Sequence, residues 1–166
     1  MAQGYVPHAV AIGVGATALM DLWNLLLRRA FAIPSLDYCL LGRWLSYMPT
    51  GTLRHARIGA APPRPHECAV GWVGHYTIGV MLALGFVFVV VSPRWIDHPT
   101  LLPALLYGIV TVCFPYFVMQ PSLGLGIAGS KAARPAQTRL KSLATHSVFG
   151  LGLHACAVGL QAALQG

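Results

Sequence analysis

Residues 69–91 read AVGWVGHYTIGVMLALGFVFVVV, a continuous run without an aspartate, glutamate, lysine or arginine. At a rise of about 1.5 Å per residue, a helix of this length crosses the roughly 30 Å hydrocarbon core of a bilayer. Three further stretches are long and apolar enough, so the predicted transmembrane helices span residues 9–31, 69–91, 100–120 and 142–164. We therefore expect an all-α polytopic membrane protein with a single four-helix transmembrane domain over residues 1–166.

The composition of the chain supports this interpretation. Of its 166 residues 56% are hydrophobic and only 9% are charged, whereas a soluble domain carries about 25% charged residues. An ordinary soluble globular domain is therefore excluded. The formal net charge of +7 comes without a basic stripe or a nucleic-acid-binding module, so we expect membrane lipids as partners and no nucleic acid.

Basic residues are distributed unequally between the predicted loops. Ten of the eleven lysines and arginines occupy or border the first and third loops, and the second loop has Arg94. Loops rich in lysine and arginine remain in the cytoplasm. We therefore expect a multi-pass protein of the bacterial inner membrane with both termini in the periplasm. The amino terminus lacks the basic region of a secretory signal, so the first apolar segment is expected to be retained.

The first predicted loop contains a short amphipathic helix over residues 36–48. Apolar side chains recur there at helical spacing between Pro34 and Pro49, and the segment is too short to span a bilayer. Aromatic residues of the kind that favour membrane interfaces lie along it: Tyr38, Trp44 and Tyr47. We expect this helix to lie in the cytoplasmic interface; the alternative is a short helix packed on the bundle.

The first loop is also rich in arginine, and its irregular part contains several prolines. Clusters of basic residues beside a membrane attract anionic lipid head groups. Four residues are the candidates for this role: Arg43, Arg54, Arg57 and Arg64. The alternative is a solvated loop that only determines the topology.

Polar side chains inside the predicted spanning helices form a second candidate site. An ionisable group in lipid costs several kcal/mol unless it is paired or hydrated, so such residues often mark functional sites. Counted from Arg28, Ala69 and Lys141 at the inner ends of their helices, Asp21, His75 and His146 lie about 8–10 Å deep in the cytoplasmic half. Small residues share their helix faces, which therefore point into the bundle. The predicted polar layer consists of Asp21, Asn24, His75, Gln120 and His146.

Several uses of this polar layer remain open. The first is a site that binds or relays a small solute or protons. The second is a redox subunit in which Asp21, His75 and His146 hold a transition metal, or two histidines hold a haem. The third is a packing contact in a membrane scaffold or assembly factor that acts through its basic loops. Four helices are few for a transporter, which favours a homo-oligomer or another membrane subunit as partner.

We expect no catalytic residues, because the sequence has no nucleophile elbow or oxyanion arrangement. Gly124, Gly126 and Gly129 fit the pattern G-x-G-x-x-G, but a spanning helix precedes them where a dinucleotide site requires a strand. The four cysteines form no Cys-x-x-Cys pair and are interpreted as small buried or inert side chains. Pro115 is expected to bend the inner end of the third helix.

Six blocks of the sequence are distinctive: ATALMDLWNLLLRR, IPSLDYCLLGRWLSYMPTG, GWVGHYTIG, TLLPALLYGIVTV, FVMQPSLGLGIAGSK and RLKSLATHSVFGLGL. Together they resemble the bacterial integral membrane proteins of domain-of-unknown-function family 2938, over about residues 10–153. The resemblance implies a four-helix inner-membrane protein. It implies no activity, cofactor or site residue.

Overall fold

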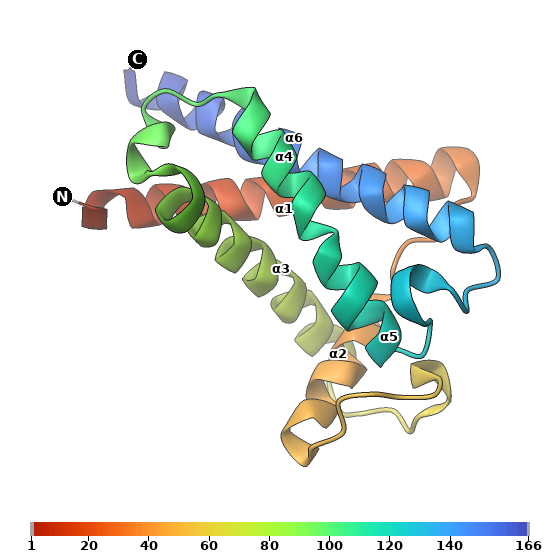
Figure 1. Ribbon diagram of the computed structural model, residues 1–166. Helices are drawn as coiled ribbons and strands as arrows, with labels where there is room; N and C mark the ends of the chain where they lie inside the picture. Colours follow the sequence, from red (N-terminus) through yellow and green to blue (C-terminus); the bar gives the residue numbers. More distant parts are fainter. Residues whose placement is uncertain (1, 166) are drawn as a thin grey trace. The chain divides into compact units, whose positions relative to one another are not determined.

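The computed structural model describes residues 2–165, with the side chains of residues 4–165. Every regular element in this part of the chain is a helix, and four helices are long and apolar enough to cross a membrane (Figure 1). The all-α class and the four predicted spanning helices are thereby confirmed. The four spans are Val6–Phe31, Glu67–Val91, Leu101–Ser122 and Pro135–Gln165.

Contacts divide the chain into two compact units, which are described separately. Unit 1 consists of Met1–Pro34, Tyr76–Val110 and Thr145–Gly166, and unit 2 of Ser35–His75 and Thr111–Ala144. Helix α1 (Val6–Phe31) belongs to unit 1 and α2 (Tyr38–Tyr47) to unit 2. Three elements contribute residues to both units: α3 (Glu67–Gly85), α4 (Leu101–Thr111) and α6 (Pro135–Gln165). The single-domain arrangement stays a prediction.

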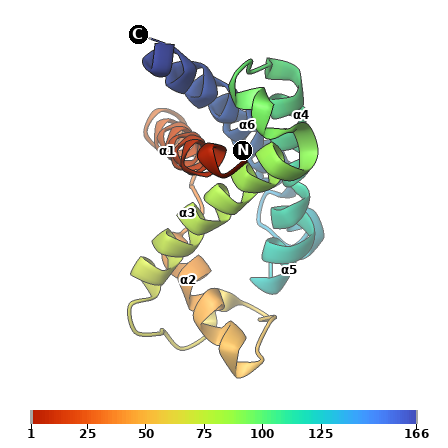
Figure 2. The same cartoon turned by 90° about the vertical axis from the view of Figure 1, so that its left-hand side faces the viewer.

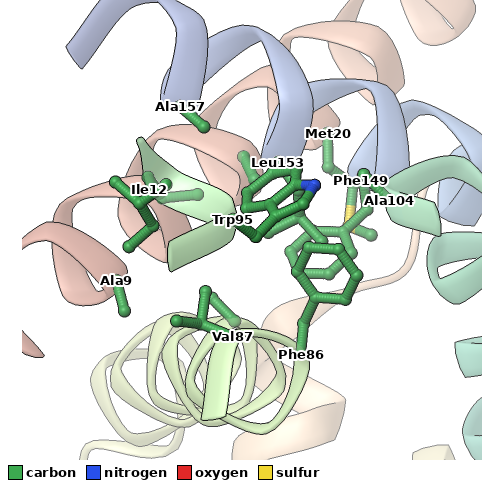
Figure 3. Packing of buried hydrophobic residues seen from close by; sticks show 13 residues of the cluster. Ala9, Ile12, Met20, Phe86, Val87, Trp95, Ala104, Phe149, Leu153 and Ala157 are labelled. Atoms are coloured by element: carbon green, nitrogen blue, oxygen red, sulfur yellow. The ribbon is translucent and has the colours of Figure 1, made fainter. Parts of the chain in front are cut away.

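A cluster of apolar side chains lies at the core of unit 1. The rings of Phe86 and Trp95 meet edge to face, with their centroids 4.8 Å apart, and Phe149 and Leu153 of α6 lie beside them (Figure 3). Smaller side chains such as Ala9 of α1 complete the cluster and are fully buried. Because α1, α3, α4 and α6 all contribute, this one cluster joins the helices of the unit.

Small residues allow these helices to approach closely. A Cβ atom on Gly13 of α1 would lie 2.9 Å from the Cα atom of Val80 in α3, and one on Gly79 would lie 2.0 Å from Oγ1 of Thr17. Helices α4 and α6 meet in the same way, because a Cβ atom on Gly108 would lie 2.6 Å from Cα of Gly150. Such contacts are typical of membrane helices, where packing replaces the hydrophobic effect as the source of association.

The loop between the second and third spanning helices, residues 92–100, contacts the start of α1 and the end of α6. The Tyr5 hydroxyl donates a hydrogen bond of 2.7 Å to Oδ2 of Asp97, and this bond raises the pKa of Tyr5. The side-chain amide of Gln161, near the end of α6, donates to the backbone carbonyl of the same Asp97. The start of α1, the end of α6 and this loop therefore lie at one end of the unit.

Large apolar side chains cover the outside of unit 1. Val89 is 84% exposed, Leu102 66% and Met81 62%. Side chains of this size and number favour contact with lipid over contact with water. The exposed surface therefore agrees with the spanning assignment made from length and composition.

In unit 2, α2 packs against the start of α3 (Figures 1 and 2). A Cβ atom on Gly42 would lie 1.7 Å from the backbone oxygen of Glu67, and one on Gly71 equally close to that of Tyr38. This close approach brings Cys39 and Cys68 together, and they form a disulfide. The interpretation of all cysteines as inert side chains was therefore wrong for this pair. The pairing depends on the glycines that let α2 and α3 approach, and the spacing of the cysteines in the sequence does not reveal that approach.

Two predicted boundaries need correction. The fourth spanning helix begins at Pro135 and not at residue 142, because the basic residues before 142 are helical although they are not apolar. The short helix begins at Tyr38 and not at residue 36, since the side chain of Asp37 caps it by accepting a hydrogen bond from the backbone N–H of Cys39.

The third spanning helix is interrupted near its end, as the prolines predicted. Helix α4 ends at Thr111, and the π-helical segment Pro115–Met119 and the short α5 (Gln120–Ser122) follow. Proline lacks the N–H that a regular helix requires, so the hydrogen-bond pattern changes at Pro115. The chain then turns at Gly124, whose φ of +89° favours glycine.

Candidate functional site

Asp21 provides a carboxylate within the helices of unit 1. It lies on α1 four residues after Thr17, on the side that packs closely against α3. The hydroxyl of Tyr76 on α3 donates a hydrogen bond to this carboxylate, and Oδ2 of Asp21 is buried from solvent. The structure thus places the predicted Asp21 at a contact between two spanning helices.

Asn24 lies about one turn further along α1 and joins a different helix. Its side-chain oxygen Oδ1 accepts a hydrogen bond of 3.4 Å from the hydroxyl of Thr145 on α6. Asn24 is 9% exposed and Thr145 8%, so the bond lies inside the unit. Asp21 and Asn24 therefore connect α1 to α3 and to α6 on consecutive turns.

His146 follows Thr145 on α6 and is half-buried. Its backbone carbonyl lies against Gly108 of α4, and Gly150, one turn later, packs on the same helix. The contact shows that this part of α6 faces α4 with its small residues.

The other two predicted layer residues belong to unit 2. Nε2 of His75 lies 3.1 Å from the Tyr38 hydroxyl, at hydrogen-bond distance, and the two rings stack with centroids 4.3 Å apart. Nε2 of Gln120 donates a hydrogen bond of 3.2 Å to the hydroxyl of Ser142, and Gln120 is only 4% exposed. Each residue is thus joined to a hydroxyl group within its own unit.

The metal hypothesis finds no donor set in the described chain. Over residues 2–165, no group of three or more histidine, cysteine, aspartate and glutamate side chains is close enough to hold a metal ion. The imidazole of His75 already contacts a phenol. The metal-binding use of Asp21, His75 and His146 stays a prediction, because Asp21 and His146 belong to unit 1 and His75 to unit 2.

The basic residues of the first loop divide into two classes. Arg43 is held by a bidentate ion pair with Glu67, with Nε to Oε2 at 2.8 Å and Nη2 to Oε1 at 2.7 Å. Its Nη1 donates to the backbone carbonyl of Ala61 at 2.9 Å, and the hydrogen bonds to Glu67 raise the pKa of Arg43. Because all its donor groups point to protein acceptors, Arg43 serves the fold and is a poor head-group ligand.

Arg64 is likewise engaged with the protein. Its guanidinium lies 3.9 Å from the centre of the Tyr47 ring, and its backbone N–H donates to Oε2 of Glu67 at 2.8 Å. Arg54 and Arg57, in contrast, are exposed. Of the four predicted head-group arginines, two are therefore structural and two are accessible.

The hydroxyl partners of the polar residues were not predicted from the sequence: Tyr38, Tyr76, Ser142 and Thr145. The predicted layer contains groups that ionise or carry amides, whereas Tyr38 was interpreted only as an interfacial aromatic residue and the other three hydroxyl residues were given no role. Their helix positions provide a usable signal. Tyr76 directly follows His75, and Thr145 directly precedes His146.

Comparison with known proteins gives a family and no activity. No curated protein and no solved structure matches the chain significantly. The family described as "Protein of unknown function (DUF2938)" matches residues 10–159. This match covers most of the sequence and confirms the resemblance seen in its distinctive blocks. The chain therefore belongs to the DUF2938 family of proteins of unknown function.

Proposed function

We propose that this protein relays protons through hydrogen-bonded side chains inside unit 1, with Asp21 as the central group. The observation that carries the proposal is the hydrogen bond between Tyr76 and the buried carboxylate of Asp21 on neighbouring spanning helices. Burying an ionised carboxylate inside a spanning helix costs several kcal/mol, and a carboxyl group can both accept and release a proton. A phenol beside it extends the path by one hydroxyl group.

The pair of Asn24 and Thr145 supports the same proposal. It lies about one helical turn, roughly 4.5 Å, from Asp21 along α1, so polar groups follow one another along this helix. A hydroxyl can both accept and donate a proton, while the amide of Asn24 fixes the direction of its partner. The two pairs together place polar groups on consecutive turns of α1.

A site for a small solute is the second use that was predicted for these residues. A solute site needs a cavity with a few convergent polar groups. The groove of about 350 Å³ between α1 and α6 is instead apolar, since its lining includes Leu19, Leu22, Trp23, Leu26, Val148 and Leu151. We therefore favour the proton relay, because this groove offers a solute few polar contacts, whereas Asp21 provides a carboxylate at a contact between two helices.

We also place the protein in a bacterial inner membrane, with both termini in the periplasm and the two basic loops in the cytoplasm. Ten basic residues against one support this orientation. The common end formed by Tyr5, Asp97 and Gln161 fits termini on one side. The Cys39–Cys68 disulfide is more typical of an oxidising compartment, but the charge bias extends over two loops and outweighs a single pair.

The proposal is tested by proton flux. Full-length protein is reconstituted in liposomes that contain a pH-sensitive dye, and a pH gradient is imposed. Wild type should collapse the gradient faster than empty liposomes do, and Asp21→Asn should lower this excess rate at least tenfold. Asp97→Asn, which changes a carboxylate outside the spanning helices, should retain the wild-type rate. A wild-type rate equal to that of empty liposomes would refute the proposal.

A further inference from the structure

Unit 2 contains a basic cavity that is separate from the proposed proton relay. The cavity has a volume of about 520 Å³ and is open to the outside. Its lining comes from two segments that are far apart in the sequence, one in each basic loop. The lining residues are Arg54, His55, Ala56, Pro121, Gly124, Gly126, Ile127, Ser130 and Lys131.

Backbone contacts hold the two segments together. The N–H of His55 donates to the carbonyl of Ser122 at 2.8 Å, and the N–H of Ile58 donates to that of Leu123 at 3.1 Å. A Cβ atom on Gly124 would lie 2.2 Å from the backbone oxygen of Ala56, so the chains touch at this glycine. These contacts place Arg54 and His55 beside the glycine-rich loop, residues 124–131.

The glycine-rich loop positions the remaining polar groups. A Cβ atom on Gly126 would lie 2.3 Å from Oγ of Ser130 and 3.1 Å from Cγ of Lys131, so both side chains fold back over this glycine. The N–H of Lys131 donates to the carbonyl of Leu125 at 2.8 Å and closes the loop. The G-x-G-x-x-G pattern thus forms a cavity wall here, and not a dinucleotide fingerprint.

The charge of the cavity is positive and uncompensated. Its lining contains Arg54 and Lys131 and no acidic residue. The acidic residues of unit 2 are engaged elsewhere, since Asp37 caps α2 and Glu67 pairs with Arg43. Nε2 of His55 is buried and has no hydrogen-bond partner among the described residues. A ligand that brings negative charge and acceptor oxygens would satisfy these groups together.

We propose that this cavity binds a phosphate group, with Arg54, Lys131, Ser130 and His55 as its ligands. The phosphate belongs to a phosphomonoester in solution or to an anionic phospholipid head group. The site is independent of the proton relay, because every lining residue lies in unit 2. It also sharpens the expectation for the arginines of the first loop, since Arg54 lines the cavity and Arg57 does not.

The test uses full-length protein in nanodiscs of phosphatidylcholine. One arm titrates glycerol 3-phosphate in a calorimeter. The other adds phosphatidylglycerol to the nanodiscs and measures its retention by native mass spectrometry. Wild type should bind in at least one arm, and the double variant Arg54→Gln/Lys131→Gln should bind at least tenfold more weakly. Binding of glycerol 3-phosphate identifies a soluble phosphomonoester, and retention of phosphatidylglycerol alone identifies a head group.

Two variants control for charge and folding. Arg57→Gln removes an exposed arginine of the same loop outside the cavity and should bind within twofold of wild type. Lys131→Arg keeps the charge and should retain binding. The proposal is overturned if neither arm shows binding, if the double variant binds as wild type does, or if Arg57→Gln loses as much as the double variant. Circular dichroism confirms that the compared variants have equal helix content.

Discussion

The two units of this protein use different interactions to hold their helices together. Helices touch at glycines in both units, but in unit 1 they are connected by single hydrogen bonds such as that between Thr145 and Asn24. In unit 2, a bidentate ion pair and a disulfide connect α2 to α3, and cationic side chains surround a cavity. The difference indicates that close packing and hydrogen bonds hold the helices of unit 1, whereas an ion pair and a covalent bond add to the packing in unit 2.

The largest effect is expected from the glycine contacts of unit 1. A Cβ atom on Gly150 would lie 2.6 Å from the backbone oxygen of Ala104, so Gly150→Leu must separate α6 from α4. We expect loss of the folded protein, or destabilisation of about 3 kcal/mol or more. Unfolding in a denaturing detergent, followed by circular dichroism, measures it.

Gly159→Leu is the matched control for this change. Gly159 lies on the same helix, but a Cβ atom there would meet nothing within 4 Å. The control should unfold as wild type does. If Gly150→Leu were equally harmless, close packing of α4 and α6 would not hold unit 1 together.

In unit 2 the ion pair should give the next largest effect. Arg43→Met leaves Glu67 without its partner at a site where the two side chains are only 11% and 13% exposed. We expect a loss of about 3 kcal/mol, measured by the same unfolding experiment. The double variant Arg43→Met/Glu67→Leu should recover part of this loss, because no isolated charge remains. Equal losses in both variants would mean that the contacts of Arg43 with backbone carbonyls matter more than the ion pair.

The fold was predictable to the extent that hydropathy determines it. Residues 69–91 and the three other apolar stretches predicted all four spans, since the cost of burying charge in lipid acts on composition alone. The start of α6 at Pro135 was missed, because helix formation tolerates the charged residues that membrane insertion does not. The Cys39–Cys68 pair was missed, because it depends on how closely two helices approach at Gly42 and Gly71.

The candidate site was predictable by residue type but not by partner. Asp21 and Asn24 were selected because polar groups are rare in apolar helices, and in the structure both lie at contacts between helices of unit 1. Their use as a polar site stays a prediction. Whether Tyr76 and Thr145 face α1 depends on how α3 and α6 are rotated about their own axes. The hydropathy of these helices does not determine that rotation. Residues 124–131 contain a single charged residue, Lys131, so the sequence did not indicate that this loop and Arg54 line the same cavity.

The smallest effect is expected from the neutral hydrogen bond of unit 1. Thr145→Val keeps the shape of the side chain but removes the donor to Asn24. A loss of about 1 kcal/mol is expected, since bonds of this kind between membrane helices have modest net values. Thr138→Val removes a hydroxyl that donates to the carbonyl of Arg134, four residues earlier and directly before α6, and it should change the unfolding free energy less. The opposite order would remove the distinction between bonds that join helices and bonds within one.

The most direct test separates the function of Asp21 from its packing. Unfolding free energy in detergent and proton flux in liposomes are measured on the same preparation of Asp21→Asn. An amide keeps the size of the side chain and can still accept the hydrogen bond of Tyr76, but it cannot exchange protons. The account predicts a change of less than about 1 kcal/mol in stability together with loss of the flux. A variant that loses stability but conducts protons at the wild-type rate would contradict it.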